Sequence, residues 1–358
     1  MTPVEHAGAA RVASAVPSAV RSLYPGYFAL VMATGITSTA MLGVGRATLS
    51  AALLVIACLC GAVLLTLYGW RLVGAWPETR DDLARPATGF AFFTVVAGLN
   101  VVGSRLAADG HTGLALVLLL VSVVPWILLS YVVPAGFVLV PRSEPVLAAV
   151  NGTWFIWVVG TQSVAVSTAA LEPAAGGHRR EVALAAVLMW STGMFLYVIV
   201  ATLVLVRLLL FRVAPADLTP PYWVSMGATA ISVLSGARLL DMAPAPALVV
   251  ARPVVAGMSL ALWAFGTWLV PMLVIFGVWR HVLQRVDLVY TPSMWSIVFP
   301  VGMYGVASAA LGRAADLPVL EGIGHAEAWV ALPVWAVTFL AMLGAVGRAA
   351  LRPRQRAA

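Results

Sequence analysis

Apolar residues in this chain gather into ten long runs separated by short polar segments. The runs are continuous, which is typical of membrane-spanning helices and not of the alternating strands of a β-barrel. No Asp, Glu, Arg, Lys or His lies inside any run. The predicted helices cover residues 24-45, 52-70, 87-104, 113-140, 151-170, 182-206, 222-237, 253-279, 291-312 and 328-347.

Polar residues are distributed unevenly between these predicted helices. The odd-numbered helices hold 23 Ser, Thr, Asn and Gln residues in 98 positions, whereas the even-numbered helices hold 9 in 119. Lipid gives no reason to enrich hydroxyl and amide groups on every second helix. The pattern therefore predicts an all-α integral membrane fold. Its odd helices form an inner ring around a polar pore, and its even helices form an outer ring against lipid.

The chain also divides into five units, each with one odd and one even helix. Within three units a glycine precedes an arginine by 11 residues, or three helical turns: Gly35 and Arg46, Gly227 and Arg238, Gly302 and Arg313. Each hairpin returns the chain to the same side, so the sequence predicts five parallel repeats rather than inverted ones. The units cover about 24-86, 87-150, 151-220, 221-289 and 290-349.

Charge gives the expected orientation. All 21 basic residues are arginines, and the net charge is +7. If residues 1-23 are cytoplasmic, 14 arginines fall on that side and 7 on the other, which predicts that both termini are cytoplasmic. We expect a multi-pass protein of the cell's inner (plasma) membrane. This bias explains the basic composition without nucleic-acid binding. We expect a short tail at 1-23, one transmembrane domain at 24-349 and a basic cytoplasmic tail at 350-358.

Three segments resemble a known family. They are YPGYFALVMATG at 24-35, DLARP at 82-86 leading into FFTVVAGLN at 92-100, and PSMWSIVFP at 292-300. They are similar to the first, third and ninth helices of the tellurite-resistance / C4-dicarboxylate transporter family, which includes plant slow-type anion channels and fungal malate and sulfite permeases. The resemblance implies ten helices in five hairpins, an inner pore of odd helices and a homotrimer with one pore per subunit.

The resemblance also implies a gate. The family's ninth helix carries a phenylalanine that closes the pore, and it matches Phe299 in this chain. Pro300 follows directly and removes a backbone donor, which loosens the helix at that turn. A bulky apolar ring there blocks ions sterically and by dewetting. The alternative is an ordinary packed or lipid-facing aromatic residue.

Small, polar and aromatic residues of the odd helices are candidates for the pore wall. Hydroxyl and amide groups replace part of an anion's hydration, and small residues leave room for it. The alternative for the glycines is close helix packing. The candidates are Gly35, Thr34, Phe93, Asn100, Gly160, Thr161, Gln162, Gly227, Thr229, Ser232, Ser296 and Gly302.

Four arginines follow the odd helices and are candidates for positive charge at the outer mouth. They are Arg46, Arg105, Arg238 and Arg313. The fifth predicted helix ends near Glu172 without such an arginine, so the ring of charge is incomplete. These side chains either raise the local anion concentration or extend to lipid phosphates.

The sequence therefore predicts a channel-like pathway for small anions: C4-dicarboxylates, sulfite- or tellurite-type oxyanions, or halides. The alternative is a proton-coupled C4-dicarboxylate transporter, which commonly needs an intramembrane acidic residue or histidine. An enzyme is a third reading, with Asp316, Glu321, His325 and Glu327 in the last external loop as its densest cluster. Their spacing is not that of a metal site, so we expect no catalysis, metal or cofactor.

Overall fold

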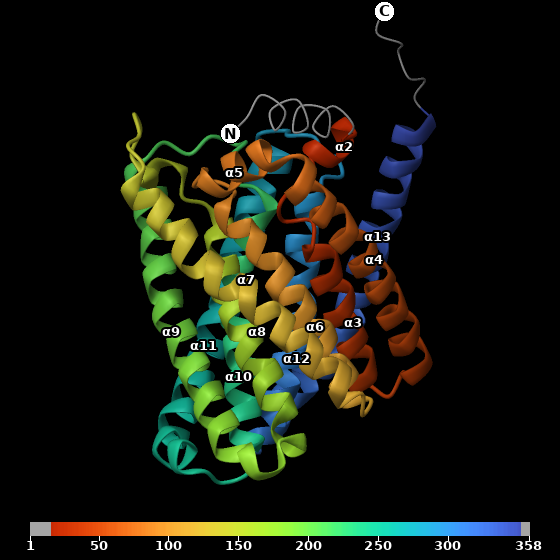
Figure 1. Cartoon of the computed structure of the whole chain (residues 1–358), viewed down its shortest axis with the longest axis vertical. Coiled ribbons are helices and arrows are strands. Elements are labelled where there is room, and N and C mark those ends of the chain that lie inside the picture. Colours follow the sequence, from red (N-terminus) through yellow and green to blue (C-terminus); the bar gives the residue numbers. More distant parts are fainter. Residues whose placement is uncertain (1–15, 352–358) are drawn as a thin grey trace, which may run out of the picture.

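The computed structural model describes residues 16–351, within which all regular secondary structure is helical (Figure 1). Short and long helices alternate along the chain. The five short helices have 15 to 20 residues: α3 (Ala29–Gly43), α6 (Phe93–Ala108), α8 (Phe155–Leu171), α10 (Val224–Asp241) and α12 (Trp295–Ala314). The five long helices have 28 to 34: α4 (Ala47–Gly74), α7 (Thr112–Leu139), α9 (Arg179–Leu210), α11 (Pro246–Val278) and α13 (Pro318–Leu351).

Four of the short helices begin in the same way, through a 3-10 turn. Proline occupies the start of two of these turns, where its missing N–H is not needed, and Asn151 caps a third by accepting from the Thr153 N–H. The turns are η1 (Gly89–Phe92), η3 (Gly152–Trp154), η6 (Pro220–Trp223) and η8 (Pro292–Met294). The recurrence of one local geometry supports the repeat predicted from the sequence.

Nine of the described helices are long and apolar enough to cross a membrane. The tenth, α3, is apolar but has only 15 residues, which corresponds to about 22 Å of helix. The two classes also differ in burial. In the most apolar window of α6, α8, α10 and α12, 78% to 89% of residues are buried, against 11% to 33% in the long helices.

The short helices contact one another in a closed cycle: α3 with α6, α6 with α8, α8 with α10, α10 with α12, and α12 with α3. Each short helix also packs against the long helix that follows it. In addition, each long helix contacts the short helix of the next unit, and α13 returns to α3. The core of the molecule is therefore the ring of short helices, and the long helices cover it.

Four glycines that the sequence offered as pore candidates lie where neighbouring short helices meet. A Cβ atom added to any of them would fall only 2.8 to 3.0 Å from a side chain of the next helix. These contacts favour the packing role, because small residues let the backbones approach. The pairs are Gly35 with Val101, Gly160 with Phe93, Gly227 with Pro300, and Gly302 with Ile36.

Several predicted boundaries were wrong. The predicted external loop that held Glu321, His325 and Glu327 is the beginning of α13, which starts at Pro318 and has Glu321 in its first turn. Proline at a helix start and an acidic residue in the first turn both favour this geometry. The short predicted span at 222-237 continues to Asp241. An additional helix, α5 (Trp76–Ala84), precedes the second unit.

The segment before α3 is only partly described. Val16 and Val20, which belongs to α2 (Ser18–Arg21), pack against Ala75, and Leu67 of α4 packs against the same cluster. The predicted tail at 1-23 otherwise falls outside the described residues up to position 15, as does the C-terminal tail beyond 351.

Arginines at the end of two long helices hold the loops that lead to the next unit. Arg71 bonds Asp82 at 2.5 Å and is almost fully buried. Arg207 bonds Asp217 at 3.0 Å. Buried arginines require such partners because an unpaired charge away from water is costly.

Candidate functional site

A cavity lies on the axis of the ring and is lined by all five short helices. On each helix the lining residues recur every three or four positions, so one face of each helix looks inward. The polar members are Thr39 on α3, Asn100, Ser104 and Arg105 on α6, Ser163 on α8 and Arg238 on α10. The apolar members include Ile36, Leu234 and Met303. The cavity therefore lies toward the C-terminal ends of the short helices.

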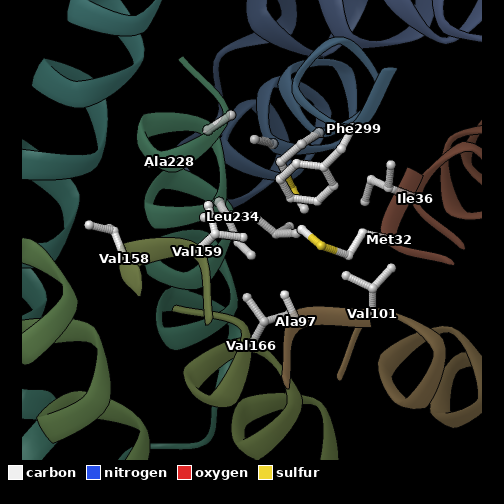
Figure 2. Close-up of a cluster of buried hydrophobic side chains, with 14 of the residues drawn as sticks. Met32, Ile36, Ala97, Val101, Val158, Val159, Val166, Ala228, Leu234 and Phe299 are labelled. Atoms are coloured by element: carbon white, nitrogen blue, oxygen red, sulfur yellow. The ribbon is translucent and has the colours of Figure 1, made fainter. Parts of the chain in front are cut away.

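Phe299 lies one turn before Met303 on α12. It is therefore on the side of the cavity that is farther from the C-terminal ends of the short helices. Figure 2 shows its ring directed into a cluster of apolar side chains that includes Met32, Ile36 and Leu234. Phe299 is only 1% exposed. The axis of the ring is thus filled by hydrocarbon at this level.

A second cavity adjoins the first toward the C-terminal ends of the helices. Thr39 and Arg238 line both cavities, and Arg313 and His325 line the second. Arg313 pairs with Glu321 at 3.4 Å. Together the two cavities trace a route from the helix ends toward Phe299, with basic side chains along it.

The three predicted mouth arginines that line these cavities differ in their partners. Arg105 is 2% exposed, pairs with Asp109 at 2.6 Å and donates to Ser50 Oγ on α4 at 2.9 and 3.1 Å. Arg238 has no ion-pair partner within residues 16–351, although the charges of Asp241 and Arg313 act on it. Arg238 is therefore the cavity cation with its charge least compensated.

Arg46 is placed elsewhere. Its guanidinium lies 5.4 Å from the centre of the Trp329 ring, and neither cavity includes it. A cation over an indole face is a favourable contact near a membrane surface. The structure therefore brings Arg105, Arg238 and Arg313 toward the axis and leaves Arg46 at the periphery.

Most of the predicted hydroxyl and amide candidates face the long helices instead of the axis. Thr34 accepts from the Trp335 indole on α13 at 3.0 Å, and Thr161 accepts from the Trp126 indole on α7 at 3.0 Å. Gln162 donates to the backbone carbonyl of Trp190 on α9 at 3.1 Å.

The two hydroxyl candidates on α10 are bonded to backbone groups. The Ser232 carbonyl accepts from the Trp190 indole at 3.2 Å, and Thr229 and Ser232 donate their own hydroxyls to backbone carbonyls one turn earlier on α10. Ser296 and Phe93 are buried and line neither cavity. Of the twelve predicted wall residues listed from the sequence, Asn100 lines the central cavity.

Sequence reasoning missed Thr39 and Ser104 as lining residues. Thr39 donates to the Gly35 carbonyl at 3.1 Å, and Ser104 bonds Ser167 at 2.9 Å. Both lie on the face that carries Ile36 and Asn100, three or four residues away. That spacing is the signal in the sequence that identifies them once one inward position is known.

Residues 22–343 match the family model described as voltage-dependent anion channel, SLAC1. The chain belongs to the SLAC1 family. The resemblance found in the three sequence segments is thereby confirmed. Members of this family are membrane channels and transporters, and the apolar helices described above agree with a membrane protein.

The chain is also similar to other proteins. An uncharacterized membrane protein of Mycobacterium tuberculosis is 59% identical over 150 residues, which cover 42% of this chain and 76% of that protein. Two uncharacterized transporters of Methanocaldococcus jannaschii are 23% and 22% identical. Their alignments cover 72% and 92% of this chain, and 73% and 96% of the respective relative.

Within the described part of this SLAC1 family member, no three His, Cys, Asp or Glu side chains lie close enough together to hold a metal ion. The His325 ring nitrogen lies 4.0 Å from Glu321 Oε1 in the first turns of α13. Glu321 is shared with Arg313, so the three side chains form a surface charge cluster beside the second cavity.

Proposed function

We propose that this protein is a channel-like pathway for small anions along the axis of the short-helix ring. In this proposal ten helices cross the membrane as five hairpins, with the short helices around the pore and the long helices against lipid. One observation carries it. The axial cavity is lined by all five short helices and contains Arg238, a cation without an ion-pair partner among residues 16–351.

The direction of the short helices supports anion passage. They run parallel because a long helix returns the chain after each one. None of the five has an acidic residue in its first turn. Their N-terminal N–H groups and dipoles therefore favour an anion at that end of the ring. At the opposite end Arg105, Arg238 and Arg313 offset the negative ends of the dipoles.

Phe299 is the proposed gate. Its buried ring leaves no room for water among Met32, Ile36 and Leu234, and an ion that enters such a constriction loses its hydration without compensation. Pro300 has no N–H group to donate to the preceding turn of α12, so one backbone hydrogen bond is missing there. A change in the geometry of this turn therefore breaks one hydrogen bond fewer. Gly227 on α10 lets Pro300 approach closely.

The remaining parts of the proposal concern setting and substrate. Apolar residues exposed on the long helices, such as Val250 and Leu209, suit contact with lipid or with other copies in a homotrimer. The protein would lie in the plasma membrane with both termini cytoplasmic. Its substrates would be small carboxylates, sulfite- or tellurite-type oxyanions, or halides.

Reversal potentials test the charge argument directly. Full-length protein in planar bilayers, with unequal salt concentrations on the two sides, is expected to show anion-selective currents. Replacement of Arg238 by Gln should lower the anion-to-cation permeability ratio by about fivefold, corresponding to ~1 kcal/mol of electrostatic energy. Arg46→Gln is the matched control, because Arg46 lines neither cavity. Cation-selective currents from the wild-type protein would overturn the proposal.

A further inference from the structure

We propose that the axial cavity is a specific binding site for a small monoanion that also carries a hydroxyl group. Arg238 would bind the negative charge, and the amide oxygen of Asn100 would accept the hydroxyl hydrogen. The inference rests on the proposed anion pathway and names the class of anion that the cavity prefers.

The orientation of the Asn100 amide is fixed by its neighbours. Its nitrogen donates to the Val96 carbonyl at 3.0 Å, and a carbonyl can only accept. The same nitrogen lies 2.9 Å from Ser122 Oγ and 3.3 Å from Ser163 Oγ. The amide oxygen is therefore on the opposite side of the group.

Neither serine is able to turn its hydrogen toward that oxygen. Ser122 donates to the Leu119 carbonyl at 2.8 Å, and Ser163 donates to the Gly160 carbonyl at 2.6 Å. The Asn100 oxygen is thus a buried acceptor with no hydrogen-bond partner in the part of the chain described here, on a residue that is 1% exposed and lines the cavity. Buried acceptors are rarely left without a donor, so a cavity ligand that donates is favoured.

The charge at this site comes from α10. Arg105 also lines the cavity, but Asp109 and Ser50 already occupy its guanidinium. Arg238 lines the same cavity and forms no ion pair with any residue between 16 and 351. A ligand bound between α6 and α10 would therefore meet a cation on one side and an acceptor on the other.

This pair of groups discriminates between anions of similar size. Nitrate satisfies Arg238 but offers only acceptor oxygens, so its negative charge faces the lone pairs of the Asn100 oxygen. Hydrogencarbonate has the same planar shape and charge and one hydroxyl group, so it satisfies both residues. A site with a fixed polar group discriminates strongly against ligands that leave that group unpaired.

Equilibrium binding to purified full-length protein tests the site without relying on transport. Sodium nitrate and sodium hydrogencarbonate are titrated by calorimetry at the same ionic strength and a mildly alkaline pH. Hydrogencarbonate is expected to bind at least about tenfold more tightly. Hydrogencarbonate exchanges with carbon dioxide in solution, so the comparison is repeated with a second pair of anions. This pair is acetate and glycolate, which differ by one hydroxyl group.

Variants separate the two roles. Asn100→Leu keeps the approximate size and should reduce the hydrogencarbonate preference to within about twofold, with nitrate binding retained. Arg238→Gln should weaken both anions, and Arg46→Gln should change neither. If Asn100→Leu fails to fold because its bonds to α7 are lost, the wild-type preference alone decides. Equal affinity for both members of each anion pair would mean that water satisfies the Asn100 oxygen, and would overturn the proposal.

The outcomes also distinguish this inference from the proposed function. Anion-selective currents without a hydroxyl preference would refute the site and leave the pathway intact. A hydroxyl preference in binding that disappears in Asn100→Leu, with no current in bilayers, would retain the site and refute the pathway.

Discussion

Replacement of Phe299 by Ala is the sharpest test of the gate. The change removes a ring that is 1% exposed and lies against Met32, Ile36 and Leu234. In a closed protein core, loss of a buried Phe ring costs about 3–5 kcal/mol. Because Ile36 and Leu234 also line the axial cavity, we expect the vacated space to join it and admit water, with a loss of about 3 kcal/mol, at the lower end of that range. The variant should therefore fold, with a lower midpoint of thermal unfolding.

Replacement of Phe299 by Ala lowers stability but is expected to raise anion transport. Without the ring, the apolar constriction widens and hydrated anions no longer lose their water at that level. We expect anion flux to rise at least about tenfold, which corresponds to a permeation barrier lower by ~1.4 kcal/mol. The assay is anion efflux from liposomes, with the membrane voltage held constant by a potassium gradient and ionophore.

Phe195 provides the matched control. It lies on α9, is 74% exposed, and in the proposed arrangement faces lipid. Phe195→Ala should leave flux unchanged, which separates removal of the gate from a general loss of packing. An unchanged or lower flux in a Phe299→Ala protein that retains its helical content and elutes as one species would refute the gate.

Three further substitutions test the packing of the ring and of the segment after α4 in purified protein, by the midpoint of thermal unfolding. A Cβ atom added at Gly160 would lie 2.8 Å from the Phe93 ring, so Gly160→Val should lower the free energy of unfolding by about 1–3 kcal/mol or more. An unchanged stability would show that α6 and α8 do not pack this closely. Trp126→Phe removes the indole donor to α8 and should cost about 1 kcal/mol without a change in ion selectivity. Asp82→Asn weakens the buried pair with Arg71 and should lower stability by about 2–4 kcal/mol, whereas the exposed Asp81→Asn should have little effect.

The alternation of polarity predicted the two classes of helix, but for a reason that differs in part from the one first given. Hydroxyl groups on the short helices were expected to meet water. Three hydroxyls of the described short helices instead accept indole hydrogens from the long helices, those of Thr34, Thr161 and Ser308. A polar group between two helices in lipid needs a partner as much as one in a pore does. Residue type alone does not separate these two environments.

The arginines show where sequence spacing fails. Arg46 and Arg238 both follow a glycine by 11 residues, yet only Arg238 reaches the cavity. α10 continues to Asp241 and keeps Arg238 in helical register. α3 ends at Gly43, and Gly45 then adopts a φ of 74°, a conformation that favours glycine and turns the chain away before Arg46. The glycine was visible in the sequence, but its effect on the register was not.

The contact of α13 with α3 has a consequence for biosynthesis. Trp335 bonds Thr34 across 301 positions of the chain, so α3 lacks this partner until the last helix has been made. Until then the Thr34 hydroxyl of nascent α3 would bond only the Leu30 carbonyl of its own helix. Pulse-labelled ribosome-bound intermediates should remain protease-sensitive up to that moment and become resistant in a single step, after α13 emerges.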